Sequence, residues 1–342
     1  EKFLLSIENT ELLRDVLKIS YQRSLRNGEI FLNESSHTIK KDFFDVFFTD
    51  SEWVKQYYNL TFYDYTILDD LTGQDSFLSM GFKADEDINN YSLSSIKKSL
   101  SGYKLRLFID ASLSQNTFES TKKVFGKSFI AILSEMDLLS GGTIISNPTN
   151  LSIQEIEIIK QKKCSVMISI SDYINLHDKK INLDELLSAG LKIIVGTGYT
   201  GNDILSELKT LSLLIQKNTL TYEEILRTAI LNPSVIFGVS NVTGSVERNK
   251  SADLIFFDLN DIRNTMTLPE ISTENICEFV IQNLTSKDIS DVIIKGELLL
   301  KDRKELFRYM ENPEIKTKEL SDKIFSAGKF FEYKEKYLMR GR

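Results

Sequence analysis

The chain contains 342 residues, of which 42% are apolar and 27% are charged, a profile typical of a globular protein. Its formal net charge of −7 argues against a nucleic-acid partner, because binding to phosphates requires clustered Lys and Arg. No apolar run approaches the roughly 20 residues that span a bilayer and no secretory signal opens the chain, so we expect no membrane partner. Its two cysteines, Cys164 and Cys277, are too few for a disulfide framework or a Cys-ligated zinc site, which favours a reducing, cytoplasmic location.

Short apolar strands alternate with amphipathic helices over roughly the first two thirds of the chain. Helical spacing of apolar residues between Leu12 and Tyr21 predicts the first helix, and Gly28 is its expected C-terminal cap. Strands are then predicted at Ile30–Leu32, Leu60–Tyr65, Phe77–Met80, Leu105–Ile109, Thr143–Ile145, Ser165–Ile170 and Lys192–Val195. Further helices are predicted at Glu119–Leu138, Ser152–Gln161 and Asp203–Gln216.

This alternation is typical of parallel βα units with right-handed crossovers. The seven predicted strands are one short of a closed eight-stranded (β/α) barrel. On alternation alone, an open doubly wound sheet explains the pattern equally well.

The pattern changes from Gly244 onward. Gly244–Glu247 and Ala252–Asp258 are predicted as strands without intervening helices, and Val292–Leu300 as a hairpin that turns at Lys295-Gly296. A charged helical tail is expected from Lys301. The expected domains are therefore a barrel over residues 1–243, small β-domain strands over 244–300 and a C-terminal helical tail over 301–342.

Several short motifs between residues 125 and 254 occur in a characteristic order and spacing. They are Phe125-Gly126-Lys127-Ser128, Leu186-Leu187-Ser188-Ala189-Gly190, Lys192-Ile193-Ile194-Val195-Gly196-Thr197, Thr228-Ala229-Ile230-Leu231-Asn232-Pro233, Gly244-Ser245-Val246-Glu247 and Lys250-Ser251-Ala252-Asp253-Leu254. In this order they resemble the metal-dependent amidohydrolase superfamily, in its cytosine deaminase and chlorohydrolase branch. The resemblance covers roughly Phe108 to Leu300, and it implies a TIM (β/α)8-type barrel beside a small β-domain.

The resemblance also implies where catalytic residues should fall. In this family a divalent metal activates a water molecule, and His and carboxylate ligands hold the metal at the carboxyl ends of the strands. The strand-five His falls on Asp110, the proton-shuttling Glu on Leu113, the strand-six His on Asn147, a second His on Asn150, and the strand-eight Asp on Gly198. The ligand set is therefore expected to be degraded at several independent points.

Two further expectations follow from the resemblance. The strand-seven loop of the family corresponds to Ile170-Ser171-Asp172-Tyr173, which makes Asp172 another pocket candidate. The strand-one His-x-His pair is not found in the chain and would lie before Glu1, together with the first barrel strand. The first strand is thus expected to lie upstream of this chain or to be missing from it.

The remaining candidates have ordinary alternatives. The chain has two histidines, His37 and His177; either could reach the pocket, but a solvated loop position is the more ordinary reading for His37. Asp110 could be an unconventional metal ligand or a hydrogen-bonded structural residue at a strand end. Asp203 and Glu207 are expected on a solvated helix face or as caps. The pocket candidates are Asp110, Asn147, Asn150, Asp172, His177 and Gly198, with no catalytic and no metal-ligating residue assigned.

Two functions are compatible with these residues. The favoured one is a catalytically inactive amidohydrolase homologue that acts in binding or assembly, with no cofactor. The alternative is a metal-dependent hydrolase of non-peptide carbon–nitrogen bonds, of the deaminase or chlorohydrolase type, with Zn or Fe in a rearranged site that uses Asp110. The sequence leaves the partner open, including a homo-oligomer.

Overall fold

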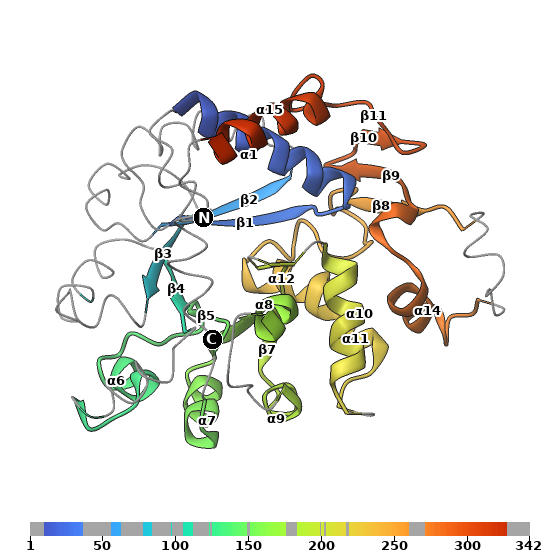
Figure 1. Cartoon of the computed structure of the whole chain (residues 1–342). Helices are drawn as coiled ribbons and strands as arrows, with labels where there is room; N and C mark the ends of the chain where they lie inside the picture. The colour runs from blue at the N-terminus through green and yellow to red at the C-terminus, as the bar shows by residue number, and fades with distance from the viewer. Residues whose placement is uncertain are drawn as a thin grey trace.

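The computed structural model describes residues 10–36, 56–62, 78–83, 97, 105–111, 123, 125–148, 151–175, 183–198, 200–201, 203–216, 219–259 and 271–326. Within these residues, a large parallel sheet with helices beside it adjoins a small antiparallel sheet (Figure 1). None of the helices in this part of the chain is long and apolar enough to cross a membrane.

The large sheet contains seven parallel strands arranged in sequence order. They are β1 (Phe31–Ser36), β2 (Tyr57–Phe62), β3 (Leu78–Lys83), β4 (Arg106–Asp110), β5 (Ile144–Ser146), β6 (Ser165–Ile168) and β7 (Lys192–Val195). The seven strands predicted from the sequence are confirmed in number and order, with β1 and β2 shifted by a few residues. In the described residues β1 and β7 are the edges of this sheet, because neither pairs with a further strand.

Several of the helices that accompany the large sheet begin at recognisable capping residues. Ser152 accepts a hydrogen bond from the backbone amide of Glu155, and Asp203 accepts one from that of Ser206, so the predicted starts of two helices are confirmed. The single helix predicted at Glu119–Leu138 is wrong, because residues 126–128 are not helical and α6 begins after its N-cap Ser128 and ends at Glu135. These helices are α1 (Thr10–Arg26), α6 (Phe129–Glu135), α7 (Ile153–Gln161), α8 (Ile170–Asn175), α9 (Leu183–Ser188), α10 (Ile204–Leu214), α11 (Tyr222–Ala229) and α12 (Leu231–Ile236).

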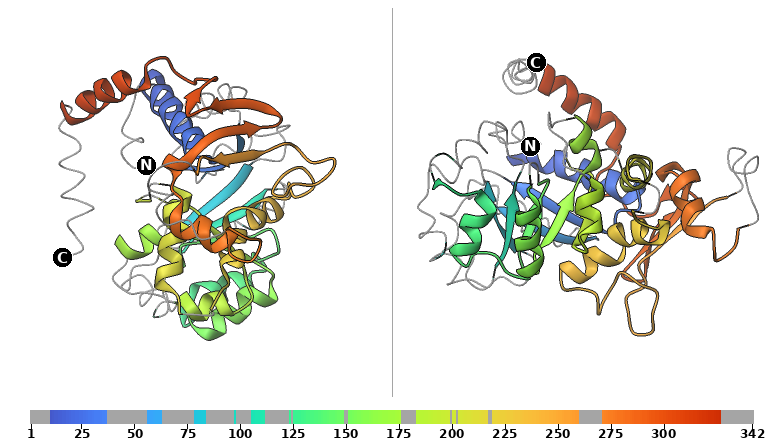
Figure 2. Two further views of the ribbon diagram at one scale, coloured as in Figure 1. Left: turned by 90° about the vertical axis from the view of Figure 1, so that its right-hand side faces the viewer. Right: turned by 90° about the horizontal axis from the view of Figure 1, so that it is seen from below.

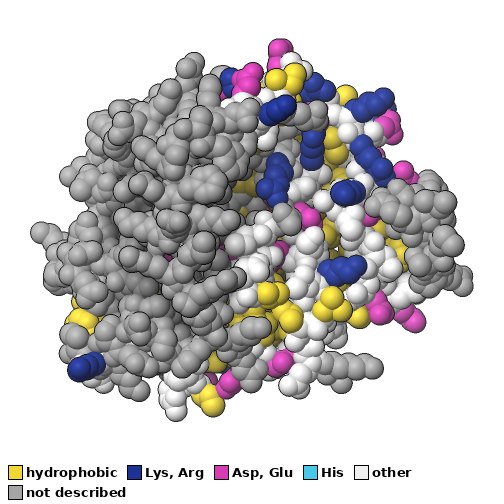
Figure 3. Space-filling view, in the orientation of Figure 1, with side chains coloured by type: hydrophobic (Ala, Val, Ile, Leu, Met, Phe, Trp, Pro, Cys, Tyr) yellow, Lys and Arg dark blue, Asp and Glu magenta, His cyan; other side chains and the backbone are white. Residues whose placement is uncertain are grey.

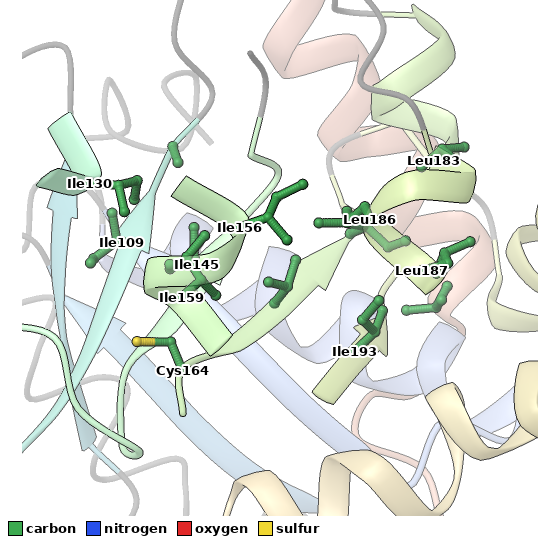
Figure 4. Close-up of a cluster of buried hydrophobic side chains, with 14 of the residues drawn as sticks. Ile109, Ile130, Ile145, Ile156, Ile159, Cys164, Leu183, Leu186, Leu187 and Ile193 are labelled. Atoms are coloured by element: carbon green, nitrogen blue, oxygen red, sulfur yellow. The ribbon is translucent and has the colours of Figure 1, made fainter. Parts of the chain in front are cut away.

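The two faces of the large sheet pack into two separate apolar clusters. Leu107 and Ile109 of β4 point into the larger cluster, between the sheet and the helices α6, α7, α9 and α10 (Figure 4). Phe108, between them in sequence, packs on the opposite face with Ile194 and with Phe237, which follows α12. This alternation follows from the strand period of two, and it places Asp110 on the same face as Phe108.

The two cysteines differ in accessibility. Cys164 lies in the larger cluster and is 2% exposed, and burial raises the pKa of its thiol to about 11, whereas Cys277 is partly exposed. Because the thiolate is the reactive form, we expect iodoacetamide at pH 8 to alkylate Cys277 in the folded protein and to spare Cys164. Peptide mass spectrometry reads both sites, with alkylation in urea as the control in which both should react. Equal rates at the two cysteines in the folded protein would contradict the burial of Cys164.

The small sheet contains β8 (Leu254–Phe257), β9 (Ile289–Ile294), β10 (Glu297–Lys301) and β11 (Lys304–Glu305), in the order β11-β10-β9-β8. The predicted hairpin turn is confirmed, since Lys295 and Gly296 have φ values of +53° and +81°, as a tight hairpin turn requires. The strand predicted at Gly244–Glu247 is wrong. This segment is irregular, and Val246 is 86% exposed because no strand of the described chain pairs with it.

Two helices in the C-terminal part correct the predicted organisation. α14 (Ile276–Asn283) was not predicted, because its sequence is rich in β-type residues; Lys209 of α10 donates to the carbonyl of Gln282 in it. The helical tail begins at Pro313 instead of Lys301, since β10 extends through Lys301 and β11 follows. This helix, α15 (Pro313–Ser326), lies beside α1 although the two come from opposite ends of the described chain (Figures 1 and 2).

Basic side chains are numerous over α1 and the small sheet (Figure 3). Three arginines in or near these elements form ion pairs within the chain: Arg26 and Arg308 with Glu305, and Arg303 with Asp258. These carboxylates neutralise part of the positive charge of these arginines.

Candidate functional site

A cavity of about 760 Å³ is lined by residues at the carboxyl ends of the large sheet and by residues of β1 and β7, its edge strands in the described part of the chain. Its apolar wall includes Phe108, Met167 and Ile194 from the strands. Other walls come from the second half of α1, from α10 to α12 and from β8. Three of the predicted pocket residues, Asp110, Asn147 and Gly198, line this cavity, whereas Asn150 and His177 lie outside the described residues.

Asp110, Asn147 and Gly198 lie together because of the sheet geometry. Asp110 is the last residue of β4, and its register partner on β5 is Ser146, which Asn147 follows. Gly198 lies just beyond the end of β7. Since the strands are parallel, their carboxyl ends share one edge, where (β/α) barrels carry their sites.

The side-chain amide of Asn147 is already used within the protein. Its Oδ1 accepts a hydrogen bond of 2.9 Å from the backbone amide of Ser169, and its Nδ2 donates to Oδ2 of Asp172 at 3.4 Å. The residue also has a φ of +42°, a conformation that Asn tolerates better than most residues. Asn147 therefore fixes the start of α8 to the end of β5.

Asp172 is completely buried and does not line the cavity. It lies in α8, which begins directly after β6, so the expected strand-seven loop is helical at this point. Its Oδ1 accepts hydrogen bonds from the backbone amide and the hydroxyl of Thr200, at 2.9 and 2.8 Å. Asp172 thus connects α8 to the turn after β7. It does not line the end of the cavity formed by Asp110, Asn147 and Gly198, which we call the mouth.

Gly198 has no space for a side chain. Its φ is +59°, and a Cβ built on it would lie 2.1 Å from Oδ2 of Asp172 and 2.4 Å from Oγ of Ser169. Contacts this short require the neighbours to move, and both neighbours are held by other hydrogen bonds. The position of the expected strand-eight ligand is therefore closed by the packing around it.

Glu207 is a buried carboxylate that sequence reasoning placed wrongly. Asp203 caps α10 as expected, but Glu207 is 0% exposed instead of solvated. Its Oε2 accepts hydrogen bonds from the amides of Ile170 and Ser171, at 2.6 and 3.1 Å, and the hydroxyl of Ser171 donates to Oε1. Burial raises the pKa of Glu207. Its position four residues before the buried Leu211 was the available signal, because such residues share a helix face.

The described residues of the mouth do not fit a zinc site. Zinc in proteins is held by His, Cys and carboxylate ligands, usually three or four of them. Among the described residues no group of three or more such side chains comes together. At the mouth, Asp110 provides one carboxylate, the amide of Asn147 is engaged, and Gly198 provides no side-chain ligand. His37 lies outside the described residues, as His177 does.

Several known proteins are similar to this chain. It is 26% identical over 220 residues to a 5′-deoxyadenosine deaminase of Methanosphaera stadtmanae, a match that covers 62% of this chain and 50% of that protein. It is 24% identical over 218 residues to a 5-methylthioadenosine/S-adenosylhomocysteine deaminase of Moorella thermoacetica, covering 61% and 49% of the two chains. The matched region thus spans about half the length of these curated relatives.

Solved structures share the fold at low sequence identity. An adenosine deaminase of Xanthomonas campestris with bound zinc superposes with a TM-score of 0.81 at 17% identity, covering 95% of this chain and 78% of that one. The zinc complex of an atrazine chlorohydrolase of Arthrobacter aurescens gives a TM-score of 0.75 at 14% identity, covering 92% and 77%. These matches show an α/β fold of the amidohydrolase barrel type.

The family assignment rests on a match to a family model. The family model described as the amidohydrolase family matches residues 95–299, which is more than half of the 342 residues. That stretch includes β4 to β7, their helices and most of the small sheet. The chain belongs to the amidohydrolase family.

Proposed function

We propose that this chain is a non-catalytic member of its family, in which the barrel binds a ligand without hydrolysing it. The observation that carries the proposal is the closed position at Gly198, where a Cβ would lie 2.1 Å from Oδ2 of Asp172. A metal ligand cannot be restored there by one substitution, and the amide of Asn147 is engaged as well. The expected proton-shuttle position, Leu113, carries no titratable group.

The cavity is the proposed binding site. Its volume of about 760 Å³ lies within the range of roughly 300–1,000 Å³ that is typical of small-molecule sites. Apolar walls and a few polar groups at the mouth suit a small molecule with an aromatic or aliphatic body and a polar end. Because relatives are named for adenine nucleosides, 5′-deoxyadenosine and 5-methylthioadenosine are the first ligands to test.

The proposal also includes the organisation of the barrel. We take β1 to β7 as strands two to eight of the family barrel, with the first strand supplied by polypeptide outside the described residues. The small sheet, β8 to β11, is the proposed β-domain, and α15 is its C-terminal helix.

Metal content and ammonia release test the loss of catalysis. After purification without chelator, we expect well below one Zn or Fe per chain, and no ammonia from either nucleoside with added Zn²⁺, Fe²⁺ or Mn²⁺. Asp110→Asn should leave the metal content unchanged and alter stability only modestly, because Asp110 is half-buried at a strand end. Elemental analysis, a coupled ammonia assay and urea unfolding are the measurements, and thermal shift with each nucleoside reports binding.

The alternative function predicts the opposite results. One bound Zn or Fe per chain that Asp110→Asn removes, together with loss of a measurable hydrolysis, would establish Asp110 as a ligand. The protein would then be a metal-dependent hydrolase with a rearranged site. Asn147→Asp serves as the matched comparison, because it changes the neighbouring mouth residue without removing the Asp110 carboxylate.

A further inference from the structure

One face of the first three strands is polar, although it is buried. It carries Asn33 of β1, Asn59 and Thr61 of β2, and Ser79 of β3, of which the last three are at most 1% exposed. The register aligns Asn33 with Asn59 and Thr61 with Ser79, so these side chains share one face of the sheet. Burial of polar groups costs free energy unless they are hydrogen-bonded, so the bonds that these four side chains make decide what each atom can still bind.

The four side chains form a network that fixes the carboxamide of Asn33. Nδ2 of Asn59 donates to Oδ1 of Asn33 at 2.6 Å, and the hydroxyl of Thr61 donates to the same oxygen at 3.3 Å. Nδ2 of Asn59 also donates to the hydroxyl of Ser79 at 3.2 Å, which anchors the network on β3. Both lone pairs of Oδ1 are thus used, and the carboxamide cannot turn over without breaking the bond from Asn59.

One donor of this network has no acceptor among the described residues. Asn33 lines the cavity, and no described residue accepts a hydrogen bond from its Nδ2. Ser146 of β5 lines the same cavity, and its hydroxyl makes no hydrogen bond with any residue that the structure describes. The cavity therefore presents a fixed N–H donor and a rotatable hydroxyl, with the apolar side chains of Phe108 and Met167 in the same lining.

Each charged side chain that lines the cavity in the described part of the chain already has a partner within the protein. Oδ2 of Asp253 accepts a hydrogen bond of 3.0 Å from the hydroxyl of Tyr57. Glu29 lies near Arg23 and accepts hydrogen bonds from two neighbouring side chains, and Asp110 and Arg23 interact with other residues of the chain. A charged ligand would therefore lose its hydration without meeting a free counter-charge among these residues.

We infer that the cavity takes an uncharged small molecule whose polar group is a hydrogen-bond acceptor, a carbonyl oxygen or a ring nitrogen, and that Nδ2 of Asn33 binds this acceptor. Because the carboxamide is already fixed, little side-chain entropy is lost on binding. The hydroxyl of Ser146 offers a second contact, which suits either a donor or an acceptor. Carboxylates, phosphates and ammonium ions are poor ligands of this cavity. The inference rests on the proposed role of the cavity as a binding site and is independent of the proposed loss of the metal site.

Three probes with one ring system and different polar groups test the inference. They are indanone, which is an uncharged ketone, aminoindane, which is an ammonium ion at neutral pH, and indanecarboxylate, which is an anion. NMR titration of isotope-labelled protein measures the affinities and follows the side-chain amide resonance of Asn33, assigned by triple-resonance experiments. We expect indanone to shift this resonance and to bind at least about 5-fold more tightly than either ion. Tighter binding of an ion, or saturation by indanone without a shift at Asn33, would overturn the inference.

Two variants measure the contribution of the donor. Asn33→Asp replaces the N–H donor with an oxygen and keeps an acceptor for Asn59 and Thr61, whereas Asn33→Leu removes the donor without adding a charge. Both should weaken indanone binding by about 2- to 10-fold. Asn283→Asp is the matched control, because Asn283 ends α14 and does not line the cavity, and it should leave the affinity unchanged. Unchanged affinity in a folded Asn33 variant contradicts the contact, and if neither variant folds, the titration of the wild type decides alone.

The outcomes separate this inference from the proposed function. If indanone binds the wild type and both Asn33 variants equally well, the cavity remains a binding site and only the assigned contact fails. If no probe binds up to its solubility limit and neither nucleoside shifts the melting temperature, the cavity is not a ligand site and both proposals fail. Because no readout here involves metal or ammonia, the test of catalysis is untouched by either result.

Discussion

Gly198→Asp is expected to destabilise the protein by about 2–5 kcal/mol and to bind no metal. The left-handed φ of +59° costs a non-glycine residue about 1–2 kcal/mol, and forcing a Cβ against Asp172 and Ser169 adds about 1–3 kcal/mol. An added carboxylate would also lie next to the buried carboxylate of Asp172. Urea unfolding followed by circular dichroism measures the loss, and elemental analysis after incubation with Zn²⁺ measures binding.

Gly238→Asp is the matched control for backbone strain. Gly238 has a φ of +75°, but nothing lies within 4 Å of a Cβ built on it. This variant should therefore lose only about 1–2 kcal/mol of stability, from backbone strain alone. The difference in stability loss between the two variants then measures the steric cost of a side chain at Gly198. Equal losses in the two variants, or stoichiometric zinc in Gly198→Asp, would show that the position is open and would remove the main support for a non-catalytic barrel.

The fold could be predicted largely from local patterns. Each of the seven strands was found because a buried parallel strand is a short, nearly continuous apolar run, such as Lys192–Val195 between helical segments. The hairpin turn at Lys295-Gly296 was also predictable from local sequence, because the positive φ values of such a turn favour Gly. Gly244–Glu247 was predicted as a strand from its residues alone, but a strand also needs a neighbouring strand to pair with, which local sequence does not reveal. The helix α14 was missed because its tertiary packing outweighs the weak β propensity of its residues.

The candidate site was predictable only in part. The resemblance to a family identified Asp110, Asn147 and Gly198, and parallel strands bring these three to one edge of the sheet. What the local sequence does not contain is the pairing across the fold: Asp172 with Thr200, Asn147 with Ser169, and the steric closure of Gly198. These contacts join residues that are 22 to 29 positions apart, so no periodicity reveals them.

Glu207→Ala is expected to cost about 3–5 kcal/mol, the largest loss of stability predicted for a single side chain here. Two backbone amides, of Ile170 and Ser171, would lose their acceptor inside the protein, and each unsatisfied buried donor costs about 1–3 kcal/mol. The removed side chain would also leave a void next to the buried Leu208 and Leu211. Because α8 begins at these amides, its first turn should become the least stable part of the fold, measurable by hydrogen exchange at Ile170 and Ser171.

Glu207→Gln separates the charge of this side chain from its hydrogen bonding. Burial raises the pKa of Glu207, so the folded protein binds this proton more tightly than the unfolded chain. The free energy of unfolding therefore contains a contribution that is fully present below the unfolded pKa of about 4.3 and is lost as the pH rises through the raised folded pKa. The variant lacks this titration, so wild type should gain stability relative to Glu207→Gln when unfolding is measured at pH 4 instead of pH 8.

Glu223→Ala is the control for both Glu207 variants. Glu223 is an exposed glutamate on the next helix, α11, and its ion pair with Arg227 involves side chains that are 68% and 54% exposed. Exposed pairs contribute little, so this substitution should change the free energy of unfolding by less than about 1 kcal/mol, with little dependence on pH. If Glu207→Ala were as mild as Glu223→Ala, its carboxylate would be solvated as the sequence first indicated. The amides of Ile170 and Ser171 would then need another acceptor.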